Sequence, residues 1–511
     1  MNIAGLLADG IARAGDRLAL VQGARSLTYR ELGDRVARLA AGLAGLGLRR
    51  GDRIVLLMPN RPELIESLWA AFHGGFVAVP VNWHLHPDEV GYIVRHCGAA
   101  AVVVSDETAA ATRTLPDGVR VLRVGRGEGP DTGLDHAGPG NTGLGDTGLD
   151  YEDVLAPAAS PIADAVAEDP AWLFYTSGTT GRPKGATLTH RNLAAMTEAY
   201  HRDLDPVAGG SIYLHAAPLT HGSGLYLLPS TARGATQVIA PGTSFSARDF
   251  VALLEKHQVT HAAFLAPTML RRVVDEARGR TFPSLRSVVV GGAPLYQEDL
   301  RAAVGVLGPI VIQMYGQGEA PMTITVMPAA AALDHPGSCG RAFHGVEIRV
   351  ADTVGEPVPD AADGEVLVRG DVVMRGYWDN PDATAATLAG GWLHTGDIGH
   401  LDAGYLHLTD RAKDVIITGG SNVYPREVEE VLLTHPAVRE AAVVGVPDPE
   451  WGESVRAFVV ATGDPAPAEL IQYCRSRLAS FKKPREVILV TELPKNAAGK
   501  ILKRELRRLP S

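Results

Sequence analysis

The densest group of chemically useful residues lies between Tyr175 and Gly185, where hydroxyls, glycines and one lysine follow each other closely. Glycines let the main chain approach an anion, and hydroxyls add donors that rotate to suit it. A Walker phosphate loop needs Gly, four residues and then Gly-Lys-Ser/Thr. Here Lys184 follows Pro183, and Gly185 stands where the Ser or Thr would be. We therefore expect a phosphate-binding loop of another kind.

Two later segments directly follow apolar runs that read as strands, and in a parallel sheet ligands bind beyond the carboxyl ends of the strands. After Val288–Val290 comes Gly291–Pro294, whose glycines would let a flat ring lie against the main chain. In the second segment, Tyr315 can stack on a base and Glu319 can hold a magnesium ion that bridges phosphates. Taken singly, these patterns are also typical of ordinary strand-to-helix turns and surface residues.

Three further signals lie nearer the C-terminus. Asp397, in a Thr-Gly-Asp turn, suits the two hydroxyls of a ribose, although Asp is also a common turn former. The charges and glycines between Thr409 and Asn422 indicate either a hinge or a solvated linker. Lys500 stands in a turn before a basic terminal helix. A lysine near the C-terminus is, by itself, most often a solvent-exposed side chain with no functional role.

The elements that must position these residues alternate between strand and helix. Thr28 and Glu31 predict a capping box that opens a helix. Expected strands cover 53–58, 77–81, 101–104, 236–240, 259–265, 287–290 and 310–314. Expected helices cover 62–73, 246–257, 267–277 and 296–306. This alternation indicates a mostly parallel sheet with helices on its faces.

The pattern changes twice along the chain. From about residue 345, shorter strands with glycine turns predict a β-rich subdomain, and from about 409 a compact α+β unit begins. We therefore predict an α/β protein with a large N-terminal domain over 1–409 and a small C-terminal domain over 410–511. Residues 125–150 are Gly-rich, acidic and repetitive, and we expect a flexible insertion there. The formal GxGxxG at 138–143 is rejected, because no strand precedes it and Pro139 interrupts it.

Bulk composition excludes several classes of protein. The 511 residues carry a net charge of −10, which argues against a general nucleic-acid-binding surface. Three distant cysteines form neither a disulfide framework nor a zinc pattern, which favours a reducing compartment. We expect no signal peptide, and the longest apolar stretch, 68–81, is interrupted by glycines and a proline and predicts no membrane span. These signals favour a cytoplasmic enzyme.

Taken together and in order, the segments resemble the motifs of the adenylate-forming superfamily, which includes acyl- and aryl-CoA synthetases, peptide-synthetase adenylation domains and luciferases. The resemblance covers about residues 25–508. It implies that a carboxylate attacks the α-phosphate of ATP, that pyrophosphate leaves, and that the acyl-AMP then passes to a thiol. It also implies a mobile C-terminal domain that carries the catalytic lysine.

The resemblance implies roles for individual residues. Lys500, Glu319 and His221 would be catalytic, with Glu319 also the magnesium ligand, and Lys413 would lie at the hinge. The residues implied to bind ATP or AMP are Thr176, Ser177, Gly178, Thr179, Thr180, Lys184, Gly292, Ala293, Pro294, Tyr315, Gly316, Gly318, Asp397 and Arg411. The residues implied to contact CoA are Gly419, Gly420, Trp451, Phe481 and Lys483.

Two positions depart from the family pattern. Thr220 stands where an aromatic residue is usual, and Gly318 stands where most members have a threonine that donates to the α-phosphate. Loss of one hydrogen bond to a charged group costs about 1.5–3 kcal/mol. Gly318 therefore bears on the efficiency of adenylation and not on the fold.

The resemblance predicts an ATP- and Mg²⁺-dependent carboxylic acid–CoA ligase, acting as a monomer or homodimer. The implied acid pocket is apolar, which suits a medium-chain fatty or an aromatic acid, and Gly222 and Gly224 would leave room for a longer tail. Two alternatives stay open. One is an adenylate-forming ligase that uses a carrier protein, an amine or another nucleophile, and the other is a non-catalytic nucleotide-binding protein.

Overall fold

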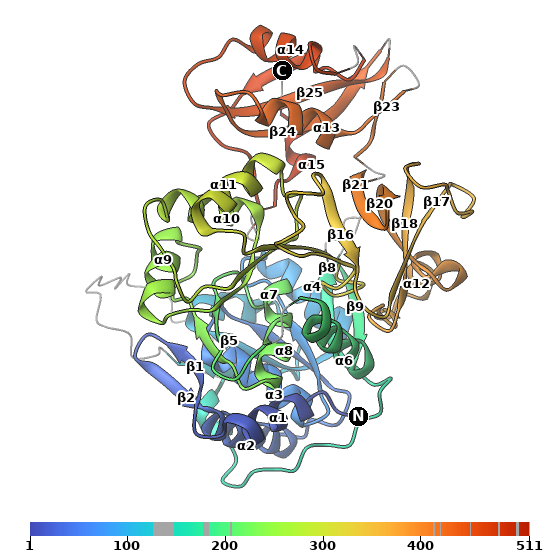
Figure 1. Ribbon diagram of the computed structural model, residues 1–511. Helices are drawn as coiled ribbons and strands as arrows, with labels where there is room; N and C mark the ends of the chain where they lie inside the picture. Colours follow the sequence, from blue (N-terminus) through green and yellow to red (C-terminus); the bar gives the residue numbers. More distant parts are fainter. Residues whose placement is uncertain are drawn as a thin grey trace, which may run out of the picture.

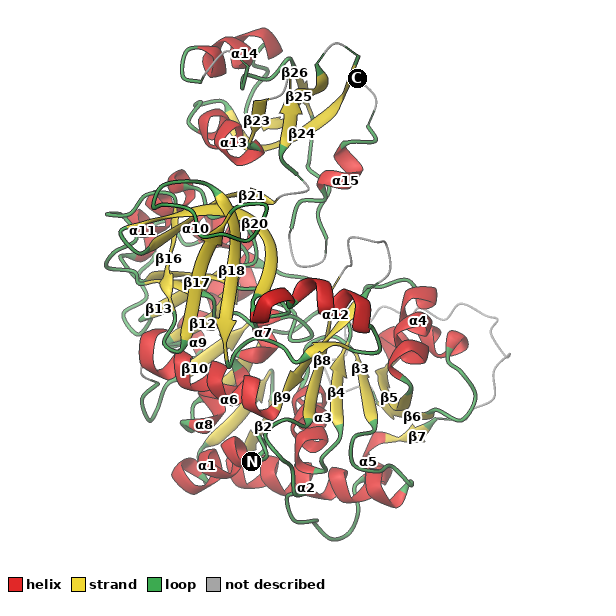
Figure 2. Cartoon of the chain, turned by 90° about the vertical axis from the view of Figure 1, so that its right-hand side faces the viewer, coloured by secondary structure: helices red, strands yellow, loops and turns green. Residues whose placement is uncertain are grey.

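The computed structural model describes residues 1–125, 148–176, 183–204, 207–411, 414–418, 421–449, 451–478, 481–496 and 500–509, with the main chain alone at 410, 411, 421 and 422. Three β-sheets organise these residues. Two large sheets lie side by side in the N-terminal part, and a smaller sheet lies above them in the C-terminal part (Figure 1, Figure 2). The expected α/β fold with a small C-terminal domain is confirmed.

The first large sheet has a parallel centre, because helices cross between its buried strands. β3 pairs in parallel with β4 and β5, and β8 joins it beside β4. In spatial order its eight described strands are β19 (Gly376–Tyr377), β9 (Lys184–Thr189), β8 (Pro170–Thr176), β4 (Val77–Pro80), β3 (Arg53–Leu57), β5 (Ala99–Ser105), β6 (Arg120–Val124) and β7 (Leu149–Asp150).

The second large sheet joins a parallel part to an antiparallel part. β10, β12, β13 and β14 pair in parallel, whereas β15 onward pair antiparallel and form the expected β-rich region. In spatial order its thirteen described strands are β17 (Val346–Ala351), β18 (Gly364–Gly370), β20 (Leu393–Asp402), β21 (Tyr405–Arg411), β16 (Ser338–Ala342), β15 (Thr325–Met327), β14 (Val311–Tyr315), β13 (Ser287–Val290), β12 (His261–Leu265), β10 (Ile212–His215), β11 (Thr236–Ile239), β1 (Leu18–Gln22) and β2 (Arg25–Thr28).

Helices cover both large sheets, and one of the buried clusters between them joins the two sheets. Trp69, Phe72 and Trp172 are fully buried in the cluster that joins the two sheets. The helices of the N-terminal part are α1 (Gly5–Ala14), α2 (Tyr29–Gly45), α3 (Pro62–His73), α4 (Pro87–Cys97), α5 (Tyr151–Val154), α6 (His190–Ala199), α7 (Gly222–Leu225), α8 (Leu227–Ala232), α9 (Ala247–Lys256), α10 (Pro267–Glu276), α11 (Gln297–Leu307) and α12 (Pro381–Thr387). Thr28 caps α2 through the predicted capping box with Glu31.

The C-terminal part forms a separate five-stranded sheet with its own core around Val443, Ala457 and Leu470. Its strands are β22 (Ile416–Thr418), β23 (Ser421–Val423), β24 (Val438–Asp448), β25 (Gly452–Ala461) and β26 (Glu486–Leu489), and its helices are α13 (Pro425–Leu433), α14 (Pro467–Arg475) and α15 (Lys503–Leu506). The predicted domain boundary after residue 409 falls inside β21 and stays a prediction.

Two further expectations concern the insertion and a membrane span. Most of the predicted insertion at 125–150 lies outside the described residues, which resume at 148. Among the described helices, none combines the length and hydrophobicity needed to cross a bilayer.

Candidate functional site

The candidate site lies where the two large sheets meet, at the carboxyl ends of the parallel strands. β12, β13 and β14 are in register side by side, so the loops after Leu265, Val290 and Tyr315 emerge at one edge. β8 of the other sheet ends at Thr176, close to the same edge. A Cβ at Gly318 would lie 2.6 Å from Thr176 Cγ2 and 2.8 Å from Phe174 Cδ1. The loop after β14 therefore packs directly on the end of β8.

A polar cluster around Asp397 joins two parts of the sheet. Tyr315 Oη donates to Asp397 Oδ2 at 2.6 Å, and Gln317 Nε2 donates to the same oxygen at 2.6 Å. Gln317 also donates to the carbonyl of Thr395 at 3.0 Å. Burial, followed by the charge of Asp397, raises the pKa of Tyr315 well above its usual value. The phenol therefore stays protonated and orients a carboxylate that is only 5% exposed.

A second polar cluster surrounds Glu319. Tyr377 Oη donates to Glu319 Oε1 at 2.7 Å, and the Lys184 ammonium lies 5.0 Å from the centroid of the Tyr377 ring. Burial and the nearby Glu319 charge raise the pKa of Tyr377, so this phenol is also a donor. A single half-buried carboxylate suits Mg²⁺, which keeps most of its waters and takes the rest of its ligands from phosphates. Within the described residues, no group of three or more His, Cys, Asp and Glu side chains forms a metal site.

His221 lies beside this junction. Its ring meets Phe174 edge-on at 6.4 Å, and its Nδ1 lies 3.5 Å from Thr220 Oγ1. Burial is the main reason why its pKa is lowered, so the imidazole is neutral near pH 7. A neutral ring next to an aromatic side chain can line a pocket for an uncharged group.

The space next to His221 is more closed than the sequence suggested. A Cβ at Gly222 would lie 2.8 Å from Met322 Sδ, and a Cβ at Gly224 would overlap the carbonyl of Leu219. Deeper in, Tyr226 stacks on Phe264 at 6.0 Å and donates to Met314 Sδ at 3.3 Å. The atoms next to Gly222 and Gly224 are thus the Met322 side chain and the Leu219 carbonyl, and the expectation that these glycines leave room for a longer tail stays a prediction.

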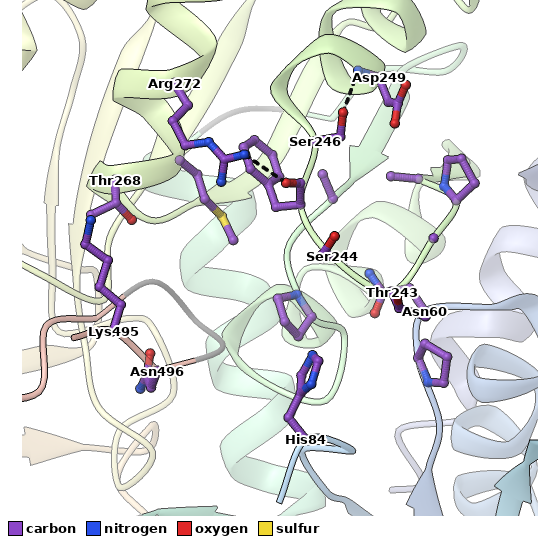
Figure 3. A pocket seen from close by; sticks show the side chains of 18 of the residues that line it. Asn60, His84, Thr243, Ser244, Ser246, Asp249, Thr268, Arg272, Lys495 and Asn496 are labelled. Carbon is purple, nitrogen blue, oxygen red and sulfur yellow. Dashed lines mark hydrogen bonds between the residues drawn. The ribbon is translucent and has the colours of Figure 1, made fainter. Parts of the chain in front are cut away.

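A cavity of about 630 Å³ lies between the N-terminal and C-terminal parts. Figure 3 shows Lys495 and Asn496, from the turn that leads to Lys500, on the opposite side of it from Asp249. The N-terminal wall includes Thr268 and Arg272, and Arg272 donates to the carbonyl of Phe245 at 3.2 Å.

Lys495 and Ile501 pair as an antiparallel bridge on either side of residues 497–499, which lie outside the described residues. The C-terminal part that carries this pair lies above the N-terminal part (Figure 2). The main-chain N–H of Asn496 donates to the Lys500 carbonyl at 2.9 Å, and the Lys500 N–H donates to Asn496 Oδ1 at 2.9 Å. Lys495 and Asn496 line the cavity, and Lys500 is hydrogen-bonded to Asn496, so Lys500 lies close to the boundary between the two parts.

Several other predicted site residues lie farther from these clusters or are only partly described. Trp451 and Phe481 are exposed on the C-terminal part, where Arg485 lies 5.0 Å over the Trp451 ring, and Lys483 is half-buried there. Arg411 is described by its main chain, which pairs with Asp397. Ser177, Gly178, Thr179, Thr180, Lys413, Gly419 and Gly420 lie outside the described residues.

Sequence reasoning assigned no role to two residues that the structure brings into the site. Gln317 lies inside a segment already singled out, between Gly316 and Gly318. Tyr377 follows Gly376 in β19, far from every segment singled out, and only the pairing of β19 with β9 brings it to Lys184. An aromatic residue after a glycine is too common a pattern to have identified it.

Comparison with known proteins shows the family to which the chain belongs. The sequence profile of the AMP-binding enzyme family matches residues 7–378, and that of the AMP-binding enzyme C-terminal domain matches residues 427–500. The chain is 39% identical over 503 residues to a feruloyl-CoA synthase from Amycolatopsis sp, covering 96% of this chain and 95% of that protein.

The chain is also similar to a ligase named for another acceptor and to a solved structure with ATP bound. The chain is 36% identical over 498 residues to the fatty acid–[acyl-carrier-protein] ligase ScoC from Streptomyces coeruleorubidus, covering 94% of this chain and 91% of that protein. The solved structure of ATP-bound MatB from Rhodopseudomonas palustris matches with a TM-score of 0.87 and 31% identity, covering 99% of this chain and 98% of that one.

Proposed function

Because the chain belongs to the adenylate-forming family of AMP-binding enzymes, we propose that it is an ATP-dependent carboxylic acid–CoA ligase. It activates the acid as an acyl-AMP with release of pyrophosphate, and then transfers the acyl group to CoA. The observation that carries the proposal is the match to a feruloyl-CoA synthase along 96% of this chain.

In the proposed mechanism, the side chains at the sheet junction bind and orient ATP. Asp397, held by Tyr315 and Gln317, accepts the ribose hydroxyls, and the Gly292–Pro294 turn borders the adenine. Glu319 would hold Mg²⁺, which when bound neutralises phosphate charge. Lys184 and Lys500 supply positive charge where negative charge develops on the phosphates. We assign the present orientation of the C-terminal part to adenylation, because it brings Lys495 and Asn496, the latter hydrogen-bonded to Lys500, to the wall of the cavity shared with the N-terminal part.

For the second step we propose a movement of the C-terminal part that withdraws Lys500 and admits the thiol. Trp451 and Phe481 are exposed and offer aromatic faces to the nucleotide of CoA. Lys482 and Arg485 lie over these rings, and the phosphates of CoA would compete with Glu427 and Asp448 for their charge. A carrier protein is the second candidate acceptor, since the chain is also 36% identical to a ligase named for an acyl-carrier protein.

For the acid, the packing around His221 favours a compact substrate. Met322 and the Leu219 carbonyl lie where Cβ atoms at Gly222 and Gly224 would be, and Tyr226 stacks on Phe264 nearby. We therefore propose an aromatic acid in preference to a medium-chain fatty acid.

The three buried cysteines, which form no disulfide, also suit a reducing, cytoplasmic location.

The first prediction is that AMP release requires ATP, Mg²⁺, CoA and an apolar acid together. The enzyme is incubated with a panel of cinnamic, benzoic and C6–C16 fatty acids, and AMP and acyl-CoA are measured by chromatography. We expect acyl-CoA from aromatic acids in preference to fatty acids. Lys500→Ala should lower the adenylation rate about 100-fold or more.

The matched control is Lys256→Ala, which removes an exposed lysine at the end of α9 and should leave the rate unchanged. ATP turnover without acyl-CoA in the presence of CoA would contradict the proposed acceptor. Equal rates in the Lys500→Ala and wild-type enzymes would contradict the role given to Lys500.

A further inference from the structure

Tyr377 contacts two charged side chains of the site at once. Its hydroxyl donates to Glu319 Oε1 at 2.7 Å, and its ring lies 5.0 Å from the Lys184 ammonium. Glu319 follows β14 of one large sheet, whereas Lys184 begins β9 of the other. Within the described residues, the carboxylate and the ammonium meet through this ring and not through a direct ion pair.

The main chain holds Tyr377 firmly in this place. β19 pairs with β9, with Tyr377 opposite Ala186, and the Trp378 N–H donates to the Gly185 carbonyl at 2.8 Å. The Tyr377 N–H donates to Thr384 Oγ1 at 2.9 Å. Just before the strand, the Met374 N–H donates to the Glu319 carbonyl at 2.7 Å. The same short segment therefore fixes the main chain of Glu319 and orients its side chain.

This arrangement has a consequence for binding a metal–phosphate group. A lysine and a carboxylate that are free to approach would pair with each other, and each would then be less available to a ligand. A neutral phenol between them leaves the full negative charge on the carboxylate, and the ring face attracts the ammonium without neutralising it.

We propose that Tyr377 is a positioning residue that orients Glu319 for the metal ion and keeps Lys184 apart from it for the phosphates. The inference rests on the proposed function, because it takes Glu319 as the carboxylate that binds Mg²⁺. Tyr377 acts through Glu319 and Lys184 and takes no part in the chemistry itself.

The test measures ATP binding by calorimetry, without acid or CoA so that no turnover occurs, once with Mg²⁺ and once with EDTA. Tyr377→Phe keeps the ring and removes the hydroxyl. We expect it to raise the Kd of Mg·ATP about tenfold, since a hydrogen bond to a charged group is lost, and to change the Kd of metal-free ATP less than twofold. Tyr377→Leu should in addition weaken metal-free ATP binding, because the ring under Lys184 is lost.

Two controls make the result specific. Tyr473→Phe removes a phenol that donates to the Thr434 carbonyl on the C-terminal part, and it should change neither constant. In a Glu319→Gln background, Tyr377→Phe should add less than a twofold further effect, because its partner has already lost its charge. Thermal unfolding of each variant verifies that the fold is kept.

The outcomes separate the inference from its premise. If Glu319→Gln weakens Mg·ATP binding and Tyr377→Phe does not, the inference about Tyr377 is overturned and the proposed function stands. If the wild-type enzyme binds no ATP, or if Glu319→Gln leaves the effect of Mg²⁺ unchanged, the premise and the inference are overturned together.

Discussion

At the scale of single residues, the site is built from polar side chains that hold one another before any ligand arrives. Asp397 receives hydrogen bonds from Tyr315 and Gln317, and Glu319 receives one from Tyr377. Such pre-ordering lowers the entropy that a ligand must lose on binding. Gly318 belongs to the same packing, because Thr176 and Phe174 occupy the space where its side chain would be.

This packing predicts the result of restoring the family's threonine at position 318. Gly318→Thr should destabilise the protein by about 1–3 kcal/mol, as overpacking does, because the new side chain meets Thr176 and Phe174. The melting temperature and the adenylation rate measure the effect, and we expect neither to rise. Gly305→Thr is the control, since nothing lies within 4 Å of a Cβ at that exposed glycine. A faster adenylation by Gly318→Thr would show that the packing opens to admit the hydroxyl.

At the scale of elements, the start of α6 ties three segments together. Asn192 completes a capping box with Thr189, and its Nδ2 donates to the carbonyls of Asp371 and Val373, both at 2.8 Å. These two hydrogen bonds fix the segment just before β19, the strand that contains Tyr377. His190, the first residue of α6, accepts the N–H of Ile3 at 3.1 Å and so fixes the N-terminal segment.

The buried His190 predicts a loss of stability in acid. Burial lowers its pKa to about 4 from the usual 6.5, so the folded protein binds its proton less readily than the unfolded chain does. The stability that depends on neutral His190 is complete above pH 6.5 and is lost as the pH falls toward 4. Between pH 7.5 and 5.5 this amounts to about 1 kcal/mol.

Thermal unfolding across this pH range measures the effect. His190→Asn keeps an acceptor for the Ile3 N–H but does not titrate, so this variant should lose less melting temperature in acid than the wild type. Part of the loss remains, because the pKa of the buried His215 is also lowered. The exposed His344→Asn should behave as the wild type does. An unchanged pH dependence in His190→Asn would contradict the assignment.

At the scale of the whole molecule, a few contacts set the orientation of the C-terminal part over the site. Tyr296 Oη donates to Glu429 Oε2 at 2.7 Å, and Arg271 donates to the Arg439 carbonyl at 2.8 Å. Glu429 is only 3% exposed and also accepts from Lys503 at 2.9 Å. The partners on the N-terminal side lie on or next to α10 and α11, the helices that Figure 1 shows directly beneath the C-terminal part.

Tyr296→Phe should shift the balance between orientations of the C-terminal part. It removes a hydrogen bond to a nearly buried carboxylate, so the orientation that we assign to adenylation loses stability. We expect the rate of acyl-AMP formation to fall several-fold, whereas transfer from a supplied acyl-AMP to CoA keeps its rate. Rapid-quench measurement of the two half-reactions tests this, with Tyr473→Phe as the control. An equal fall in both half-reactions would indicate general damage instead.

Much of the local structure could be predicted because it depends on neighbouring residues. The capping box at Thr28, the apolar runs of β3 and β13 and the helix at α10 all depend on patterns within one element. The order of the motifs also indicated the family, which the two profile matches bear out.

The composition and motifs of the chain thus determined the fold class, the family and the segments that carry the site. Tertiary structure alone decided which side chains meet. Tyr315 and Asp397 are 82 residues apart, Glu319 and Tyr377 are 58 apart, and each pair depends on which strands lie side by side. It also decided that Met322 fills the space beside Gly222. Periodicity reports on neighbours along the chain, whereas sheet order and packing depend on contacts between distant segments.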